Sequence, residues 1–114
     1  MNYNVRKMFE MVEKILKWEW TFDQFEKEYY SFYLEVPRVD LTERDASFFS
    51  AIHEKMDWTT PKLKQGEVEI GYVDQGGYVE WLRKQYDRYQ NKPEIQNFSA
   101  WDFSEKKMSE ENQS

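Results

Sequence analysis

Aromatic residues recur at helical spacing between Trp18 and Pro37, and this pattern constrains the fold more than any other part of the chain. Charged residues fill the positions between them, which predicts an amphipathic helix with one aromatic face. Thr21 and Gln24 have the spacing of a capping box, and Pro37 disfavours helix at the residue before it. We expect most rings to form core, with partner binding by some of them as the alternative. The aromatic positions are Phe22, Phe25, Tyr29, Phe32 and Tyr33.

Three further segments have the periodicity of amphipathic helices. The range Asn4 to Lys17 predicts an opening helix, joined to the aromatic helix as an antiparallel hairpin. A third helix is expected from the cap Thr42 to about Asp57, and a fourth is expected after the cap Asp74. We therefore predict an all-α fold, a four-helix up-and-down bundle.

The segment before the last helix has a different pattern. Polar and apolar residues alternate strictly from Gly66 to Tyr72, and a period of two is a strand signal. Because a lone strand has an unpaired edge, a packed extended loop is one alternative. A hairpin with residues 78–82, around Gly76 and Gly77, is the second alternative. We expect an extended, β-like connector here.

A chain of 114 residues is expected to form one domain. The helical bundle should occupy residues 1–92, and residues 93–114 should form a C-terminal extension. Phe98, Trp101 and Phe103 either pack back onto the bundle or form a short amphipathic turn. The end of the extension is almost wholly polar, so we predict that the extension is partly mobile.

Composition narrows the class of function. The net charge of −6 repels the phosphates of nucleic acids, which argues against direct nucleic-acid binding and favours a basic partner. Cysteine is absent, which fits a reducing cytoplasm and excludes disulfides and thiolate chemistry. The apolar runs are only a few residues long, so we expect no membrane association. These properties together predict a cytoplasmic protein.

No pattern of catalytic or metal-binding residues stands out, so we expect neither an enzyme nor a cofactor. The serines lack a nucleophile motif, and a phosphate-binding glycine loop is absent. His53 and Asp57 have the spacing of an acid–base pair on a helix, although a surface histidine beside carboxylates is the favoured interpretation. Arg83, Lys84 and Arg88 are interpreted as solvated cations that complement a helix dipole, in preference to a nucleic-acid face.

Acidic residues flank the third helix and continue into the connector. If these two segments lie side by side, their carboxylates share one face, with two aromatic residues as apolar anchors. Anchors surrounded by charge are typical of a protein interface with electrostatic attraction, and an ordinary solvated face is the equal alternative. The candidate partner-binding residues are Asp40, Glu43, Asp57, Trp58, Glu67, Glu69, Tyr72 and Asp74.

Three patterns in the chain are similar to those of a known protein family. A short opening helix precedes the pattern Phe22-x-x-Phe25-x-x-x-Tyr29-x-x-x-Tyr33. An apolar third helix around Phe48, Phe49 and Ile52 leads into Asp57-Trp58-Thr59-Thr60-Pro61. An acidic connector from Glu67 to Asp74 enters the last helix through Val79-Glu80-Trp81-Leu82. Over residues 1–90 the chain thereby resembles the helical immunity proteins of the colicin-D type and of contact-dependent inhibition systems.

The resemblance implies a four-helix fold and a toxin-neutralising function. Proteins of this kind cover the active site of a cationic toxin domain, often a ribonuclease acting on tRNA, with carboxylates. The implied partner is a cognate basic toxin domain of the nuclease class, bound by a monomer or weak homodimer. The glycine-rich connector and the segment after Pro93 depart from the family's pattern. The alternative function is a small acidic helical adaptor or regulator that acts as a homodimer.

Overall fold

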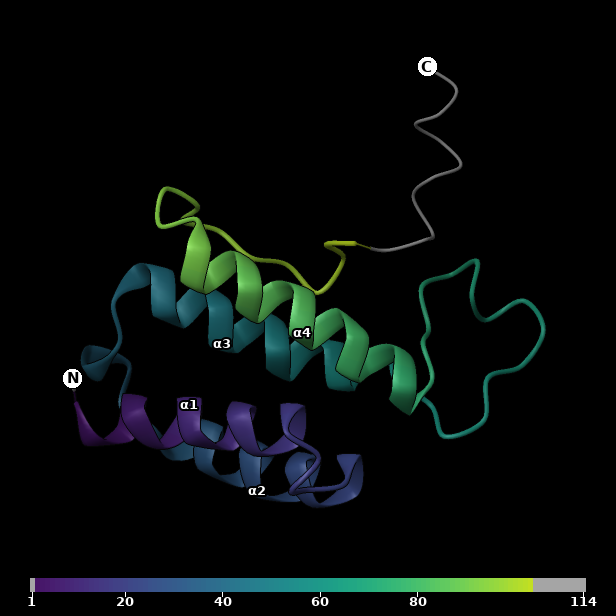
Figure 1. Cartoon of the computed structure of the whole chain (residues 1–114), viewed down its shortest axis with the longest axis horizontal. Helices are drawn as coiled ribbons and strands as arrows, with labels where there is room; N and C mark the ends of the chain where they lie inside the picture. The colour runs from purple at the N-terminus through teal and green to yellow at the C-terminus, as the bar shows by residue number, and fades with distance from the viewer. Residues whose placement is uncertain (1, 104–114) are drawn as a thin grey trace.

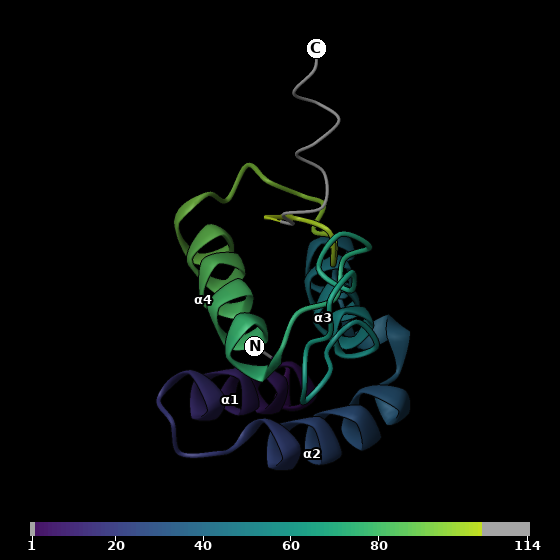
Figure 2. The same cartoon turned by 90° about the vertical axis from the view of Figure 1, so that its right-hand side faces the viewer.

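The computed structural model describes residues 2–103, which contain four α-helices and no strand. Successive helices run in opposite directions, and each contacts two neighbours in the order α1, α2, α3, α4 and back to α1 (Figures 1 and 2). The predicted all-α, up-and-down four-helix bundle is thus confirmed. The helices are α1 (Tyr3–Leu16), α2 (Phe22–Glu35), α3 (Glu43–Met56) and α4 (Gln75–Asn91), with a 3₁₀ turn at Arg38–Asp40.

Side-chain caps determine where the helices begin. The Oγ1 atoms of Thr21 and Thr42 accept hydrogen bonds from the backbone N–H three residues later, at 3.2 and 3.0 Å. Asp74 accepts in the same way through Oδ1 at 2.7 Å. Each cap pairs a backbone donor that the first helical turn leaves unpaired. All three predicted caps are confirmed, and α1 begins one residue earlier than predicted because Asn2 caps it.

The aromatic face of α2 lies in the core, as predicted for most of its rings. Four of its five aromatic positions are buried, and Phe32 is half-buried. The Tyr29 hydroxyl donates to the backbone carbonyl of Phe49 at 2.9 Å, and the Tyr78 hydroxyl donates to that of Ile52 at 3.0 Å. Burial raises the pKa of both phenols well above the usual value. These hydroxyls therefore tie α2 and α4 to the backbone of α3.

The connector between α3 and α4 is a loop whose two ends are joined at its base. Thr59 and Val73 form an isolated parallel bridge. The N–H of Val73 donates to the carbonyl of Trp58 at 2.9 Å, and the N–H of Thr60 donates to the carbonyl of Val73 at 2.9 Å. Figure 1 shows this loop projecting from one end of the bundle.

The interior of the connector consists of turns, so the predicted strand from Gly66 to Tyr72 is wrong. Residues 65–71 form consecutive turns, and Gly66 and Gly71 have positive φ angles of 89° and 108°. The alternative of a hairpin is excluded, because residues 78–82 lie within α4, and of the alternatives given for this segment the loop is the one observed. Alternating polarity is not sufficient for a strand where none of the described residues offers a neighbouring strand to pair with.

Residues 93–103 pack against the bundle, which is one of the two predicted alternatives. Phe98 is buried and belongs to the same core as the helices. Asp102 forms an ion pair with Arg88 of α4, with 2.9 Å between the charged atoms. The packed part of the chain therefore continues past the predicted bundle boundary at residue 92. The predicted mobile end of the extension, residues 104–114, lies outside the described residues.

Candidate functional site

The eight predicted partner-binding residues are divided between the two ends of α3. Asp40 and Glu43 lie at its N-terminal end, where Asp40 accepts a hydrogen bond from the Asn4 side chain at 3.0 Å. A helix of 14 residues is about 21 Å long, so these two residues do not lie beside the other six. Asp40 and Glu43 therefore lie apart from the other six, and partner binding by the eight residues stays a prediction. We call the other six the connector group: Asp57, Trp58, Glu67, Glu69, Tyr72 and Asp74.

The four carboxylates of the connector group have different roles. Glu67 accepts a hydrogen bond from the N–H of Lys64 at 2.7 Å, and Asp74 caps α4, so both stabilise the local backbone. Asp57 and Glu69 are exposed, and neither forms an ion pair within residues 2–103. Asp57 and Glu69 are consequently the two carboxylates of this group that remain available to a partner.

Trp58 and Tyr72, the predicted anchors, pack into the base of the connector. The Trp58 ring centroid lies 5.1 Å from that of Tyr72 and 4.7 Å from that of Trp101. Trp101 lies against Gly71, where the absence of a Cβ lets the indole approach the backbone. Both predicted anchors are only half-buried, so they position the loop while part of each ring stays accessible.

The exposed apolar side chains of the connector are Val68 and Ile70, which are 42% and 53% exposed. They flank Glu69, so the projecting loop presents one carboxylate between two aliphatic side chains. The alternating pattern grouped these residues with Tyr72 on one face of a strand. The observed turns remove that alternation and leave Val68 and Ile70 exposed beside Glu69, which the sequence pattern did not indicate.

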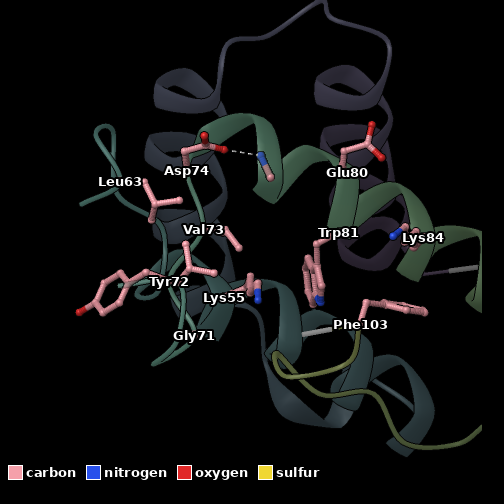
Figure 3. Close-up of a pocket in the computed structure, with 12 residues that line it drawn as sticks. Lys55, Leu63, Gly71, Tyr72, Val73, Asp74, Glu80, Trp81, Lys84 and Phe103 are labelled. Carbon is pink, nitrogen blue, oxygen red and sulfur yellow. Dashed lines mark hydrogen bonds between the residues drawn. The ribbon is translucent and has the colours of Figure 1, made fainter. Parts of the chain in front are cut away.

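A cavity of about 460 Å³ lies between the connector and α4 (Figure 3). Lys55, from the last turn of α3, and Trp81, from α4, line it and are only 1% and 4% exposed. Exposed side chains at its rim include Glu80 and Lys84. Sequence reasoning did not find this cavity. One signal was present, because Lys55 occupies a position on the apolar stripe of α3, three residues after Ile52.

Lys55 is a buried cation whose immediate surroundings are aromatic. Its Nζ lies 5.5 Å from the ring centroid of Trp81 and 5.9 Å from that of Trp101. Burial lowers the pKa of the amine, and the negative charge of Asp102 opposes that shift. The carboxylate of Asp102 is engaged by Arg88. Within the described part of the chain, Lys55 therefore has no carboxylate in ion-pair contact.

His53 does not form the acid–base pair considered for it with Asp57. Its ring centroid lies 4.6 Å from that of Tyr30 and 4.7 Å from that of Tyr33. Its Nε2 atom is buried and has no hydrogen-bond partner in the described part of the chain. The residue is half-buried against aromatic rings, which also corrects its interpretation as a surface histidine. Among residues 2–103, no cluster of His, Cys, Asp and Glu could hold a metal ion.

The basic side chains of α4 make contacts within the protein. Arg83 donates to a backbone carbonyl at the end of α1 at 3.1 Å, and Arg88 pairs with Asp102. The Lys84 amine lies 5.7 Å from the ring centroid of Phe103. These contacts favour a structural role for the cations over a nucleic-acid face.

Comparisons of the chain with protein-family models, curated proteins and solved structures found no match. The resemblance to helical immunity proteins therefore stays a hypothesis. None of the helices in the described range has both the length and the apolar composition needed to cross a membrane.

Proposed function

We propose that this protein is an immunity protein that binds and neutralises a cognate basic toxin domain of the nuclease class, for example one that cleaves tRNA. The observation that supports this proposal most directly is the projecting connector. From Asp57 to Asp74 it contains four carboxylates and two lysines, so its net charge is −2. It also presents Val68 and Ile70 beside the exposed carboxylate of Glu69.

Charge and apolar contact have separate roles in the proposed complex. The overall charge of −6 attracts a basic domain over long range and raises the encounter rate. Asp57 and Glu69 then occupy positions on the toxin that RNA phosphates would otherwise fill. Burial of Val68 and Ile70 slows dissociation. The proposed role involves no catalysis or cofactor of this chain, and it places the protein in the cytoplasm, beside the toxin's nucleic-acid substrate.

The base of the connector supports a binding role because it limits the entropy lost on association. The bridge between Thr59 and Val73 closes the loop, and the Trp58 ring packs against Tyr72 and Trp101. A loop held in one conformation before binding loses less freedom than a flexible one. The side chains at 68–70 are therefore presented on a pre-organised support.

Affinity capture with the tagged full chain, from lysate of its own source at moderate salt, identifies the partner. Mass spectrometry is expected to find one stoichiometric basic protein, and that protein should have nuclease activity that this chain inhibits. Recovery of the chain alone, as a stable dimer, would contradict the immunity proposal.

Charge reversal then tests the connector as the binding face. Glu69→Lys is expected to weaken binding of the captured toxin domain on the order of tenfold, about 1.4 kcal/mol. Glu43→Lys makes the same change of net charge at the opposite end of α3 and is expected to have a much smaller effect. Glu67→Gln removes a charge while retaining an acceptor for the N–H of Lys64. Equal dissociation constants for Glu69→Lys and the unmodified protein would refute this assignment of the site.

An exposed apolar pair on α2 supports the alternative of a homodimeric adaptor. Tyr30 and Leu34 lie one helical turn apart and are 42% and 63% exposed. Sedimentation distinguishes the two functions. A stable dimer that Leu34→Glu dissociates would favour the adaptor, whereas a monomer or weak dimer is expected for the immunity protein.

A further inference from the structure

The cavity between α3, α4 and the connector is lined by one buried donor without a partner among residues 2–103 and by a buried lysine. The indole Nε1 of Trp81 is buried and has no hydrogen-bond partner among residues 2–103. Lys55 is only 1% exposed, and its Nζ lies 5.5 Å from the Trp81 ring centroid. Figure 3 shows both side chains directed into the same space. Unsatisfied buried donors are rare in folded proteins, so the Trp81 indole beside a buried cation points to an anionic acceptor supplied from outside.

We propose that this cavity binds a small monocarboxylate that has an apolar body. One carboxylate oxygen accepts from the Lys55 amine and the other accepts from the Trp81 indole. This arrangement satisfies both donors and places an anion beside the buried cation, which otherwise has aromatic rings as its nearest neighbours.

The rest of the cavity lining selects the apolar body. Leu63, Val68, Tyr72 and Phe103 line the same space. A volume of about 460 Å³ greatly exceeds that of a carboxylate group alone, so the ligand needs further apolar atoms to fill it. An aromatic ring or a short aliphatic chain meets that requirement by contact with these side chains.

Charge at the rim excludes more highly charged anions. Asp74 and Glu80 line the cavity together with Lys84. The whole chain also carries a net charge of −6. A phosphate dianion would be repelled by this environment and would find only one buried cation. A single negative charge is the best match for Lys55.

Titration of the full chain with phenylacetate, followed by NMR of the indole N–H signals, tests the proposal. Phenylacetamide is the matched probe, because it keeps the shape and removes the charge. Phenylacetate is expected to shift the Trp81 indole signal with a dissociation constant on the order of 1 mM. Phenylacetamide is expected to bind at least about tenfold more weakly. Equal binding of the two probes, or an unshifted Trp81 signal, would overturn the proposal.

Two lysine variants separate the buried amine from general electrostatics. Lys55→Met keeps a long side chain in the core and is expected to weaken phenylacetate binding at least about tenfold. Lys27→Met removes the same charge from the exposed face of α2, away from the cavity, and is expected to change affinity by less than about threefold. Equal effects of the two variants would indicate only attraction by net charge and would overturn the role of Lys55. The immunity proposal uses the exposed carboxylates together with Val68 and Ile70, and the two lysine variants leave all of these side chains unchanged.

Discussion

Substitution of Gly71 by alanine is expected to destabilise the fold through a contact with Trp101. A Cβ placed at Gly71 would overlap the Trp101 indole, and the backbone there has a φ of +108°. Gly66 provides the matched control, since its φ is +89° and its nearest heavy atom would lie 4.0 Å from an added Cβ. The two variants thus share backbone strain, and only one adds a clash.

The expected losses in the free energy of unfolding follow from the backbone strain and the steric clash. Gly66→Ala should cost about 1–2 kcal/mol, the range for a non-glycine residue at positive φ. Gly71→Ala should cost a further 1–3 kcal/mol or so, the range for overpacking of a filled site. With an m-value of about 1–3 kcal/mol per molar urea, an added 2 kcal/mol lowers the midpoint by about 1 M. Urea denaturation of both variants measures the difference.

A double-mutant cycle identifies Trp101 as the origin of the extra cost. In a Trp101→Leu background, the cost of Gly71→Ala is expected to fall to about 1–2 kcal/mol, the backbone term alone. The reasoning is refuted if Gly71→Ala costs no more than Gly66→Ala in the unmodified background. Loss of this contact would also loosen the connector, because Trp101 packs against Trp58 at its base.

Two further predictions concern buried polar groups. Tyr29→Phe should cost about 0.5–1.5 kcal/mol at neutral pH by removing the hydrogen bond to Phe49. Burial raises the pKa of Tyr29 in the folded state, so its hydroxyl contributes fully to the free energy of unfolding below the unfolded pKa near 10. This contribution is lost as pH rises through the folded pKa. The stability difference between Tyr29→Phe and the unmodified protein should therefore shrink in urea titrations at alkaline pH. Asp102→Ala should cost about 1–3 kcal/mol, since Oδ2 of Asp102 accepts from Gln85, Arg88 and Ser99. Hydrogen exchange should then accelerate at Ser99 and stay unchanged in α1; unchanged exchange at Ser99 would contradict this role.

The helices were predictable because their signals are local. Apolar periodicity and the caps Thr21, Thr42 and Asp74 act within a few residues of each helix start, so tertiary contacts were not needed to locate them. The buried face of α4 was less predictable. Trp81 and Gln85 are buried there because residues 98–103 cover that side of the helix, and no pattern within α4 indicates this cover.

The candidate site was only partly predictable. Six of the eight proposed partner-binding residues do lie at one end of the bundle, and Glu69 remains the best candidate among them. Glu67 and Asp74, however, hydrogen-bond to their own backbone. From composition alone, a carboxylate that caps a turn cannot be distinguished from one that is available to a partner.

The sequence by itself determined that this chain forms four amphipathic helices with an acidic surface, because helix formation follows from short-range spacing and charge is a property of composition. Only the tertiary structure decided the form of the connector and the existence of the cavity. An alternating segment becomes a strand only when another strand pairs with it, and here the bridge between Thr59 and Val73 closes the segment as a loop. Lys55, Trp81 and Trp101 are far apart in sequence, and only the packing of α3, α4 and the C-terminal segment brings them together.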